Sequence, residues 1–397
     1  MSAESLNKSG RRNVTRREFL RAGAILAGTM PLMLSSSFSQ QAGGKGSRVA
    51  MAACKSYGPE VYRAMTECFD LLGGIGWLVK DKTVTVKINL TSTDFRPLFD
   101  RPPGETYVSH FATGMALATL LFKAGARRVR LVESTNSRSG LETSLGYADW
   151  DVKALEALGR VEFENTRNLG KESHYATLRV PDGGRLFSRF ELNHSYADTD
   201  VMVSLCKLKQ HVTAGVTLSM KNLFGITPNS LYGEEAGSED ATKGRGNLHS
   251  PVSFKQPALP GLKADVKTTE AETRVPRIVT DLCAARPIHL AIIDGITSMS
   301  GGEGWWCGDV GKLEFVQPGV LIAGFNPVST DAVGTAVMGY DSPRAPRGQG
   351  AFTFCDNMLL LAEEAGLGTA DLKQIDVRGL SIAQARHPYR RIRVPAI

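Results

Sequence analysis

Short runs of apolar and β-branched residues alternate with segments of helical periodicity along most of the chain. This alternation is typical of strands joined by crossover helices. The predicted strands are 49–53, 83–90, 128–134, 161–165, 201–205, 288–296 and 320–325. The predicted helices are 60–72, 107–124, 152–158, 275–285, 329–339, capped by Ser329 or Thr330, and 354–365, the last. The pattern predicts an α/β fold: a mostly parallel layered sheet with helices on both faces, with two lobes around a cleft as a variant.

Two segments interrupt the alternation. Residues 168–192 hold short alternating strands that look antiparallel, and residues 229–274 are polar, rich in glycine and proline, and have little periodicity. A loop of that length in a compact domain is usually functional or disordered. We therefore expect residues 43–397 to form a single α/β domain with a long polar loop at 229–274.

The first 42 residues have the three parts of an export signal. Arg16 and Arg17 precede a modestly apolar run, 22–34, and serines and other small residues follow it. This resembles a twin-arginine signal peptide, which implies the twin-arginine export machinery as a partner and a periplasmic or otherwise exported protein. An uncleaved signal would retain the protein at a membrane, and a basic amphipathic helix on a membrane surface is the alternative. No other segment is long and apolar enough to span a bilayer.

Composition narrows the classes of function. The chain has 397 residues, 42% of them hydrophobic, which is enough to bury a sizeable core. The net charge is +7, but residues 1–42 carry +4 of it, and the remaining +3 argues against nucleic-acid binding. No CxxC occurs, so we expect neither an iron-sulfur cluster nor a zinc knuckle. We expect most of the cysteines to be buried thiols: Cys54, Cys68, Cys206, Cys283, Cys307 and Cys355.

Polar residues follow the ends of the predicted strands. The loops at the carboxyl ends of parallel strands converge, and ligands bind there. Lys87 and Asn89 lie at the end of strand 83–90, and Lys207, Lys209 and His211 follow strand 201–205. The other such residues are Glu133, Ser134 and Asn136, then Asp294, then Asn326 and Asp331, with Lys221 and Asn222 near the end of a plausible helix.

Alternation along extended backbone places Lys207, Lys209 and His211 on one face, where their charges would repel. Solvent, protein carboxylates or a bound anion could compensate them, and the sequence leaves these alternatives open. The candidate carboxylates are Glu133, Asp294, Glu303 and Asp331. Toward an anion, the lysines would serve as point charges. Neighbouring cations would lower the pKa of His211 and suit it to proton transfer or metal ligation, whereas a loop histidine bonded to backbone is the alternative.

Two glycine-rich segments contribute further candidates. In 301–308, "GGEGWWCG", Glu303 brings a carboxylate, and the paired tryptophans offer either packing or flat surfaces for a ring. In 242–250, "TKGRGNLHS", Arg245 could approach a phosphate and His249 could join the site, but the strand and helix of a true phosphate loop are missing. Asp294 and Glu303 would orient His211 or hold a divalent metal such as Mg²⁺ through oxygen.

Four segments carry a family resemblance. "VKINL", "SLCKLKQHVTAGVTLSMKNLFG", "AIIDGITSMSGGEG" and "LIAGFNPVSTDAVGTAVMG" are similar to successive motifs of the family called domain of unknown function three-six-two. The resemblance covers residues 80–339 and implies recurrent polar residues at Lys87, Asn89, Lys207, Lys209, His211, Lys221, Asn222, Asp294, Glu303 and Asp331, with a looser match at His249. Many members of the family carry a ferredoxin segment. This sequence has none, so electron transfer would need a separate redox partner.

These observations predict an exported enzyme or cofactor-dependent protein, with the cofactor unidentified, that acts on a small anionic ligand, a phosphate or a carboxylate. His211, Asp294 and Glu303 would be catalytic. The ligand would be bound by Lys87, Asn89, Lys207, Lys209, Lys221, Asn222, Asp331 and His249. A periplasmic solute-binding module without chemistry is one alternative. A distant relative of nickel-dependent lactate racemases is another, although no pair of catalytic histidines aligns.

Overall fold

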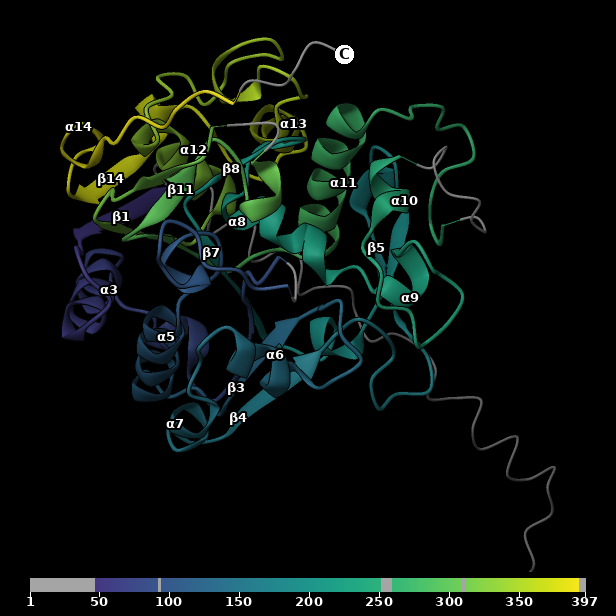
Figure 1. Cartoon of the computed structure of the whole chain (residues 1–397), viewed down its shortest axis with the longest axis horizontal. Coiled ribbons are helices and arrows are strands. Elements are labelled where there is room, and N and C mark those ends of the chain that lie inside the picture. The colour runs from purple at the N-terminus through teal and green to yellow at the C-terminus, as the bar shows by residue number, and fades with distance from the viewer. Residues whose placement is uncertain (1–46, 92–93, 251–258, 309–311, 393–397) are drawn as a thin grey trace, which may run out of the picture. The chain divides into compact units, whose positions relative to one another are not determined.

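The computed structural model describes residues 47–91, 94–250, 259–308 and 312–392. The predicted export signal therefore lies outside the described residues. A sheet of eight strands forms the middle layer of the fold, in the order β14-β1-β13-β10-β7-β2-β3-β4 (Figure 1). The strands are β1 (Arg48–Ala53), β2 (Thr83–Lys87), β3 (Arg128–Glu133), β4 (Val161–Asn165), β7 (Val201–Lys207), β10 (Leu290–Gly295), β13 (Val320–Gly324) and β14 (Asp376–Gly379).

Every neighbouring pair in this sheet is parallel except the two pairs that β13 makes with β1 and β10. Seven strands therefore run in one direction, and their carboxyl ends lie along one edge of the sheet. The prediction of an α/β fold with a mostly parallel sheet is confirmed.

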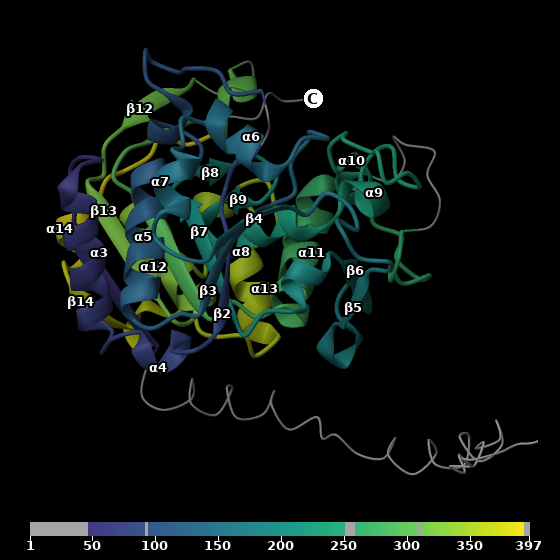
Figure 2. The ribbon, with the colours of Figure 1, turned by 90° about the horizontal axis from the view of Figure 1, so that it is seen from below.

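Helices cover both faces of the sheet because side chains along each strand alternate between two cores. In β1, Val49 and Met51 belong to one core, and Ala50 and Ala52 belong to the other. The second core is covered by α3 (Pro59–Leu71), α4 (Gly76–Val79), α5 (Phe111–Lys123), α6 (Leu141–Tyr147) and α7 (Val152–Glu156). The first core is covered by α8 (Leu218–Asn222), α11 (Ala271–Ala285), α12 (Pro327–Val337) and α13 (Met358–Glu364). Figures 1 and 2 show these two sets of helices on opposite sides of the strands.

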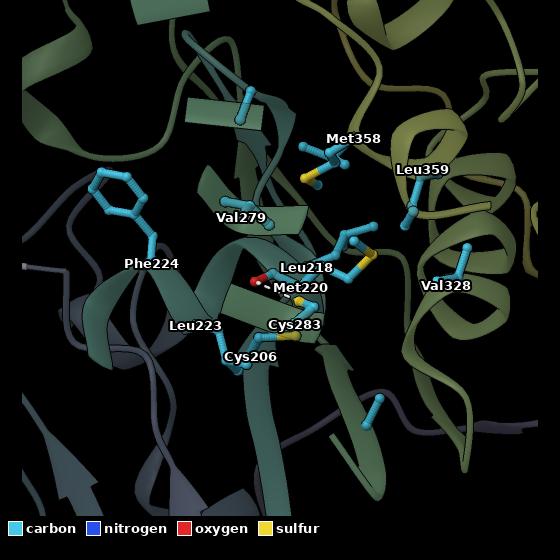
Figure 3. Close-up of a cluster of buried hydrophobic side chains, with 14 of the residues drawn as sticks. Cys206, Leu218, Met220, Leu223, Phe224, Val279, Cys283, Val328, Met358 and Leu359 are labelled. Atoms are coloured by element: carbon cyan, nitrogen blue, oxygen red, sulfur yellow. Dashed lines mark hydrogen bonds between the residues drawn. The ribbon is translucent and has the colours of Figure 1, made fainter. Parts of the chain in front are cut away.

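The core beneath α8 is tightly packed (Figure 3). Leu218 and Met220 of α8 lie against Cys206 of β7 and Cys283 of α11, and the Cys283 thiol donates a weak hydrogen bond to the Met220 carbonyl at 3.9 Å. Phe224, just after α8, lies to one side of this group. All six cysteines are buried and free. The short helix α8 is therefore anchored by its apolar side chains, which fixes the position of its polar ones.

Short elements lie outside the central sheet. The antiparallel pairs are β5 (Ala176–Arg179) with β6 (Arg189–Leu192), β8 (Gln210–His211) with β9 (Gly215–Val216), and β11 (Ser298–Ser300) with β12 (Glu314–Val316). The 3₁₀ turns are η1 (Pro103–Glu105), η2 (Pro181–Gly183), η3 (His194–Tyr196), η4 (Leu223–Ile226), η6 (Trp305–Cys307), η7 (Gly350–Phe352) and η8 (Leu372–Gln374). Segment 229–274 contains α9 (Asn229–Tyr232), α10 (Gly246–His249) and the start of α11. In the described part of the chain, no helix has the length and hydropathy needed to cross a bilayer.

Three predictions for the C-terminal part of the chain are wrong. Helix 354–365 is not the last helix, because α14 (Ile382–Ala385) follows it, after β14 has joined the sheet beside β1. The N-cap of α12 is Asn326, whose side chain accepts a hydrogen bond from the Ser329 N–H at 3.0 Å; it is neither Ser329 nor Thr330. Because β13 runs against the other strands, Asn326 follows its carboxyl end at the opposite edge of the sheet.

Candidate functional site

A cavity opens at the carboxyl ends of β2, β3 and β7. Its volume is about 90 Å³, several times the space that one water molecule needs. The residues that line it are Lys87, Asn89, Leu90, Thr91, Glu133, Ser134, Thr135, Asn136, Lys209, His211, Thr217, Lys221, Asn222, Phe224, Gly225 and Arg245. Segments that are far apart in the sequence therefore bring many nitrogen-bearing side chains into one space.

Lys87 at the end of β2 forms a buried ion pair with Glu133 at the end of β3. The Lys87 Nζ lies 2.6 Å from Glu133 Oε1, and the two side chains are 1% and 6% exposed. Glu133 also accepts hydrogen bonds from the backbone N–H groups of Leu90 and Ser134. Burial lowers the pKa of Lys87, and Glu133 opposes that shift. The charge of Lys87 is thus compensated within the protein.

Lys209 has no such carboxylate partner. Its Nζ donates to three uncharged oxygens: Thr91 Oγ1 at 3.1 Å, the Tyr107 carbonyl at 2.7 Å and the Glu303 carbonyl at 2.8 Å. The side chain is fully buried. Burial lowers the pKa of Lys209 to about 7, although the negative charge of Glu303 acts in the opposite direction. A cation held only by neutral acceptors adds unbalanced positive charge to the cavity wall.

Lys221 of α8 is less supported still. Its Nζ lies 4.3 Å from the centre of the Phe224 ring, a cation–π contact. Among the residues that the structure describes, this Nζ makes no hydrogen bond, and no carboxylate oxygen lies within 4 Å of it. Burial lowers the pKa of Lys221 to about 8, and the charges of Arg245 and Lys87 contribute to this shift.

Asp331 of α12 holds α8 in place. One carboxylate oxygen accepts from the N–H and the hydroxyl of Ser219, and the other accepts from the Met220 N–H, at 2.6 to 2.8 Å. Burial raises the pKa of Asp331 to about 7. Asp331 was predicted to bind ligand, but the structure places it at the start of α8 and outside the cavity lining.

Replacing Asp331 with alanine is expected to lower the free energy of unfolding by about 3 kcal/mol, because three buried donors lose their acceptor. Urea unfolding followed by circular dichroism measures this change. Asp371, which caps the short η8 turn at the surface, is a control, and Asp371→Ala is expected to have little effect. An Asp331→Ala variant as stable as the wild type would contradict this role.

His211 lies beside Glu303, with its Nδ1 3.4 Å from Glu303 Oε2. The Thr213 N–H donates to the same Nδ1 at 3.2 Å, so Nδ1 carries the lone pair and the ring proton is on Nε2. Nε2 makes no hydrogen bond to a described residue. Burial and the charge of Lys221 lower the pKa of His211 well below its ordinary value, and burial raises the pKa of Glu303. His211 is therefore a neutral imidazole at physiological pH.

Arg245 and Asn89 complete the polar wall. Arg245 donates to carbonyl oxygens of Thr227, Ser134 and Gly225, and no carboxylate of a described residue lies within 4 Å of it. Burial lowers its pKa. The Asn89 side-chain oxygen is buried and has no hydrogen-bond partner in the described part of the chain. Arg245, Lys209 and Lys221 thus form a cationic group with no carboxylate of a described residue within 4 Å, here called the unpaired cation group. Glu303 and Glu133 act on it from a greater distance.

His249 lies behind the cavity and not in its lining. Its Nδ1–H donates to the Arg245 carbonyl at 2.9 Å, and its ring packs edge-on against Phe224, with the ring centres 5.0 Å apart. Burial lowers the pKa of His249 to about 4. His249 is therefore bonded to backbone and neutral at neutral pH, so it adds no charge to the cavity. The same kind of backbone bond, raised as the alternative for His211, is also made by His211 with the Thr213 N–H.

Lys207 and Asp294 form a second buried cluster, separate from the cavity. Lys207 Nζ lies 3.1 Å from Asp294 Oδ2, and both side chains are 0% exposed. Lys207 also donates to the Tyr57 hydroxyl and the Gly104 carbonyl, each at 2.6 Å. The Tyr57 hydroxyl donates to Asp294, and the ring stacks on His110 at 3.7 Å. This pair was assigned to ligand binding and catalysis from sequence, but its charges are satisfied internally.

The structure brings together six of the predicted site residues in the cavity lining: Lys87, Asn89, Lys209, His211, Lys221 and Asn222. Glu303 contacts two of them from behind. Lys207, Asp294, Asp331 and His249 lie outside the lining. Sequence reasoning missed Tyr57, although it follows the carboxyl end of β1 at the same edge, and it underrated Arg245, which only its glycine-rich context pointed out. In the described residues, no group of three or more His, Cys, Asp or Glu could hold a metal ion.

Comparisons with known proteins agree with the motifs in the sequence. Residues 84–336, more than half of the chain, match the family model described as "Domain of unknown function (DUF362)". The Thylakoid-associated protein sll1697 of Synechocystis is 30% identical over 175 residues. That match covers 42% of this chain and 47% of the relative, so it spans about half of the relative's length.

Proposed function

We propose that this protein, which belongs to the family Domain of unknown function (DUF362), binds a small oxyanion, a phosphate or a carboxylate, in the cavity at the ends of β2, β3 and β7. One observation carries the proposal: Lys209 and Lys221 are buried and Arg245 is partly buried around one cavity, and no carboxylate of a described residue lies within ion-pair distance of them.

The cost of burying charge supports an anionic ligand over the other two compensations. A buried ion without a partner costs several kcal/mol, on the order of what a whole domain can spare. Solvent gives little relief, since Lys209 is 0% and Lys221 9% exposed. Protein carboxylates compensate Lys87 and Lys207, but not the unpaired cation group. A bound oxyanion would supply the missing negative charge and accept hydrogen bonds from Arg245.

His211 gives this site a group that can move a proton. Burial and the nearby cations keep the pKa of His211 low. A bound anion would offset these cations and raise the pKa of His211 toward its ordinary value, which would let the ring accept and return a proton. We therefore favour an enzyme, because catalysis would give a role to both the unpaired cation group and His211. A solute-binding module is the second candidate, and it uses the cations alone.

The two candidates differ in what His211→Ala does. For an enzyme, this variant keeps oxyanion affinity and loses turnover, whereas for a binding module it changes little. We also keep as proposals the twin-arginine export route, a periplasmic location or retention at a membrane, a divalent metal as cofactor, and a separate redox partner. The relative's name places that protein at thylakoids, and membrane association of the present chain is a proposal on the same footing.

Sulfate and phosphate binding tests the proposed site. Titration into the purified full chain, at constant ionic strength set with chloride, is expected to give saturable binding by calorimetry and a rise in Tm. Arg245→Gln is expected to weaken sulfate binding at least about tenfold, the loss of one charge-assisted contact. Lys243, two residues away, is exposed and pairs with Glu235, so Lys243→Gln is the matched control and is expected to bind as the wild type does.

A chain that stays folded but shows no saturable response to sulfate, phosphate or acetate would overturn this function. Arg245→Lys separates loss of charge from loss of packing, because it keeps a cation at the same position. If Arg245→Gln and Lys243→Gln weaken binding equally, the effect is general electrostatics and the cavity is not the site.

A further inference from the structure

We propose that Lys221 is a nucleophilic amine that forms a Schiff base with a small oxo acid, a ligand that carries both a carboxylate and a reactive carbonyl. The inference rests on the proposed oxyanion site and names the class of ligand that the site would take. It is carried by the position of the Lys221 amine: in the wall of the cavity, beside other cations, and bonded to no described residue.

The other lysines around the cavity are committed to partners. Lys87 is paired with Glu133 at 2.6 Å. Lys209 donates to two backbone carbonyls and a hydroxyl, so its nitrogen is held by three acceptors. Lys207 is paired with Asp294 outside the cavity lining. Within the described residues, the Lys221 nitrogen makes a cation–π contact with the Phe224 ring and no hydrogen bond, so it can reorient toward a ligand without breaking one.

The surroundings of Lys221 favour the uncharged amine, which is the form that attacks a carbonyl. Lysines become nucleophilic when they are desolvated or lie next to another cation. Both conditions hold here, because the side chain is buried and the charges of Arg245 and Lys87 act on it. A pKa of about 8 leaves a substantial fraction of the amine neutral near physiological pH.

The rest of the cavity fits the second group of an oxo acid. Arg245 keeps its positive charge on the same wall and has no carboxylate of a described residue within 4 Å, so it suits a ligand carboxylate, and Lys209 adds a hydrogen-bond donor beside it. The space of about 90 Å³ admits a ligand of a few heavy atoms and is small for a sugar or a nucleotide. Glyoxylate and pyruvate are ligands of this size and chemistry.

The reaction needs no oxidant or reductant. The Lys221 Nζ lone pair attacks the carbonyl carbon, a C–N bond forms, and the carbonyl π pair becomes an alkoxide that takes up a proton. The nitrogen gives up one proton and the new hydroxyl takes up a second. The C–O bond then breaks as the nitrogen lone pair forms the C=N bond, the oxygen leaves as water, and the iminium N–H returns the second proton. His211, whose pKa is coupled to the charge of Lys221, lies in the same lining and can carry the proton between nitrogen and oxygen.

Reductive trapping tests the inference. The full chain is incubated with glyoxylate or pyruvate at pH 8, reduced with sodium cyanoborohydride, and analysed by intact mass and peptide mapping. We expect one adduct per chain, located on Lys221, and we expect excess sulfate to suppress it at least tenfold. Lys221→Arg keeps a cation but no reactive amine, so it should give no adduct at this position. Lys243→Arg, at an exposed lysine, should be trapped as the wild type is.

The outcomes separate this inference from the proposed function. If sulfate binds saturably but neither oxo acid modifies Lys221, the Schiff base is wrong and the oxyanion site stands. If adducts spread over exposed lysines and Lys221→Arg is modified as much as the wild type, the Schiff base is again wrong. If sulfate fails to bind and Lys221 is not trapped, both proposals fall.

Discussion

Replacing Asp294 with asparagine is expected to lower the free energy of unfolding by about 3–5 kcal/mol, the largest stability effect predicted for a single substitution in this chain. The change keeps the shape of the side chain but removes its charge. Lys207 would then be a fully buried cation with no counter-ion, and the Tyr57 hydroxyl would lose its charged acceptor. Urea unfolding at pH 7, followed by circular dichroism, measures the difference.

Two controls show whether the effect comes from an uncompensated buried charge. The double variant Lys207→Met with Asp294→Leu removes both charges, and it should recover a large part of the lost stability, because replacing both partners of a buried pair costs far less than removing one. Glu235→Gln breaks the exposed pair with Lys243 and should produce no measurable change. A Lys207→Met, Asp294→Leu protein less stable than Asp294→Asn would argue that Tyr57 and Gly104, not the charge, set the cost.

The sequence located the cavity because strand ends are marked locally and the alternation of strands with helices predicted a mostly parallel sheet. Lys87 and Glu133 end neighbouring parallel strands, and Lys209 follows the next strand in the sheet, so the common edge brings them together. The apolar runs predicted these strands well, and the edge then followed from the parallel class. Four of the six predicted residues in the cavity lining, Lys87, Asn89, Lys209 and His211, come from this reasoning, whereas Lys221 and Asn222 were predicted near the end of the following helix.

The direction of β13 was beyond the sequence. An apolar strand buried on both faces reads the same whether it lies parallel or antiparallel to its neighbours. Because β13 is antiparallel, Asn326 lies at the edge of the sheet opposite the cavity, where it caps α12. Asp331 of α12 accepts hydrogen bonds at the start of α8. Asp331 holds the helix that carries Lys221. This structural role has no sequence motif by which it could have been predicted.

The sequence also could not show which lysine is paired inside the protein and which one faces the cavity. Lys207 and Lys209 have the same charge and are two residues apart, yet one pairs with Asp294 and the other faces the cavity without a carboxylate. The difference arises from Asp294, which lies opposite Lys207 in the register of β7 and β10. Register between strands more than eighty residues apart depends on the whole sheet and not on local pattern.

The second large effect is a loss of oxyanion affinity as the pH rises. Burial lowers the pKa of Lys209 to about 7 and the pKa of Lys221 to about 8. A bound anion favours the charged form of both amines, so the complex holds more protons than the free protein above these values. The sulfate association constant should therefore be level below about pH 6, where both amines are protonated, and fall by roughly a hundredfold or more between pH 7 and pH 9.

The folding stability contributed by these lysines changes with pH in the opposite direction to the sulfate affinity. Both folded-state pKa values lie below that of an unfolded lysine, about 10.4, so the unfolded chain binds more protons between pH 7 and pH 10. The two lysines therefore contribute increasing stability with rising pH in this window, whereas their charged forms cost stability below it. Unfolding therefore cannot explain a fall in sulfate affinity over this pH range, because these two lysines make the folded protein more stable as the pH rises.

Isothermal titration calorimetry with sulfate separates the two lysines, because the charge of sulfate does not change in this range and proton uptake can be read from buffers of different ionisation enthalpy. Lys221→Arg removes one titration, so the slope of log affinity between pH 8 and pH 9 should fall by about one proton. Other charged and titratable groups also act on this cluster: Glu303, Glu133, Lys87, Arg245, His211 and His249. The variant Glu303→Gln tests the carboxylate that acts on both lysines. A sulfate affinity that is the same at pH 6.5 and pH 9 would mean that neither lysine touches the anion, and Arg245 alone would then account for any binding.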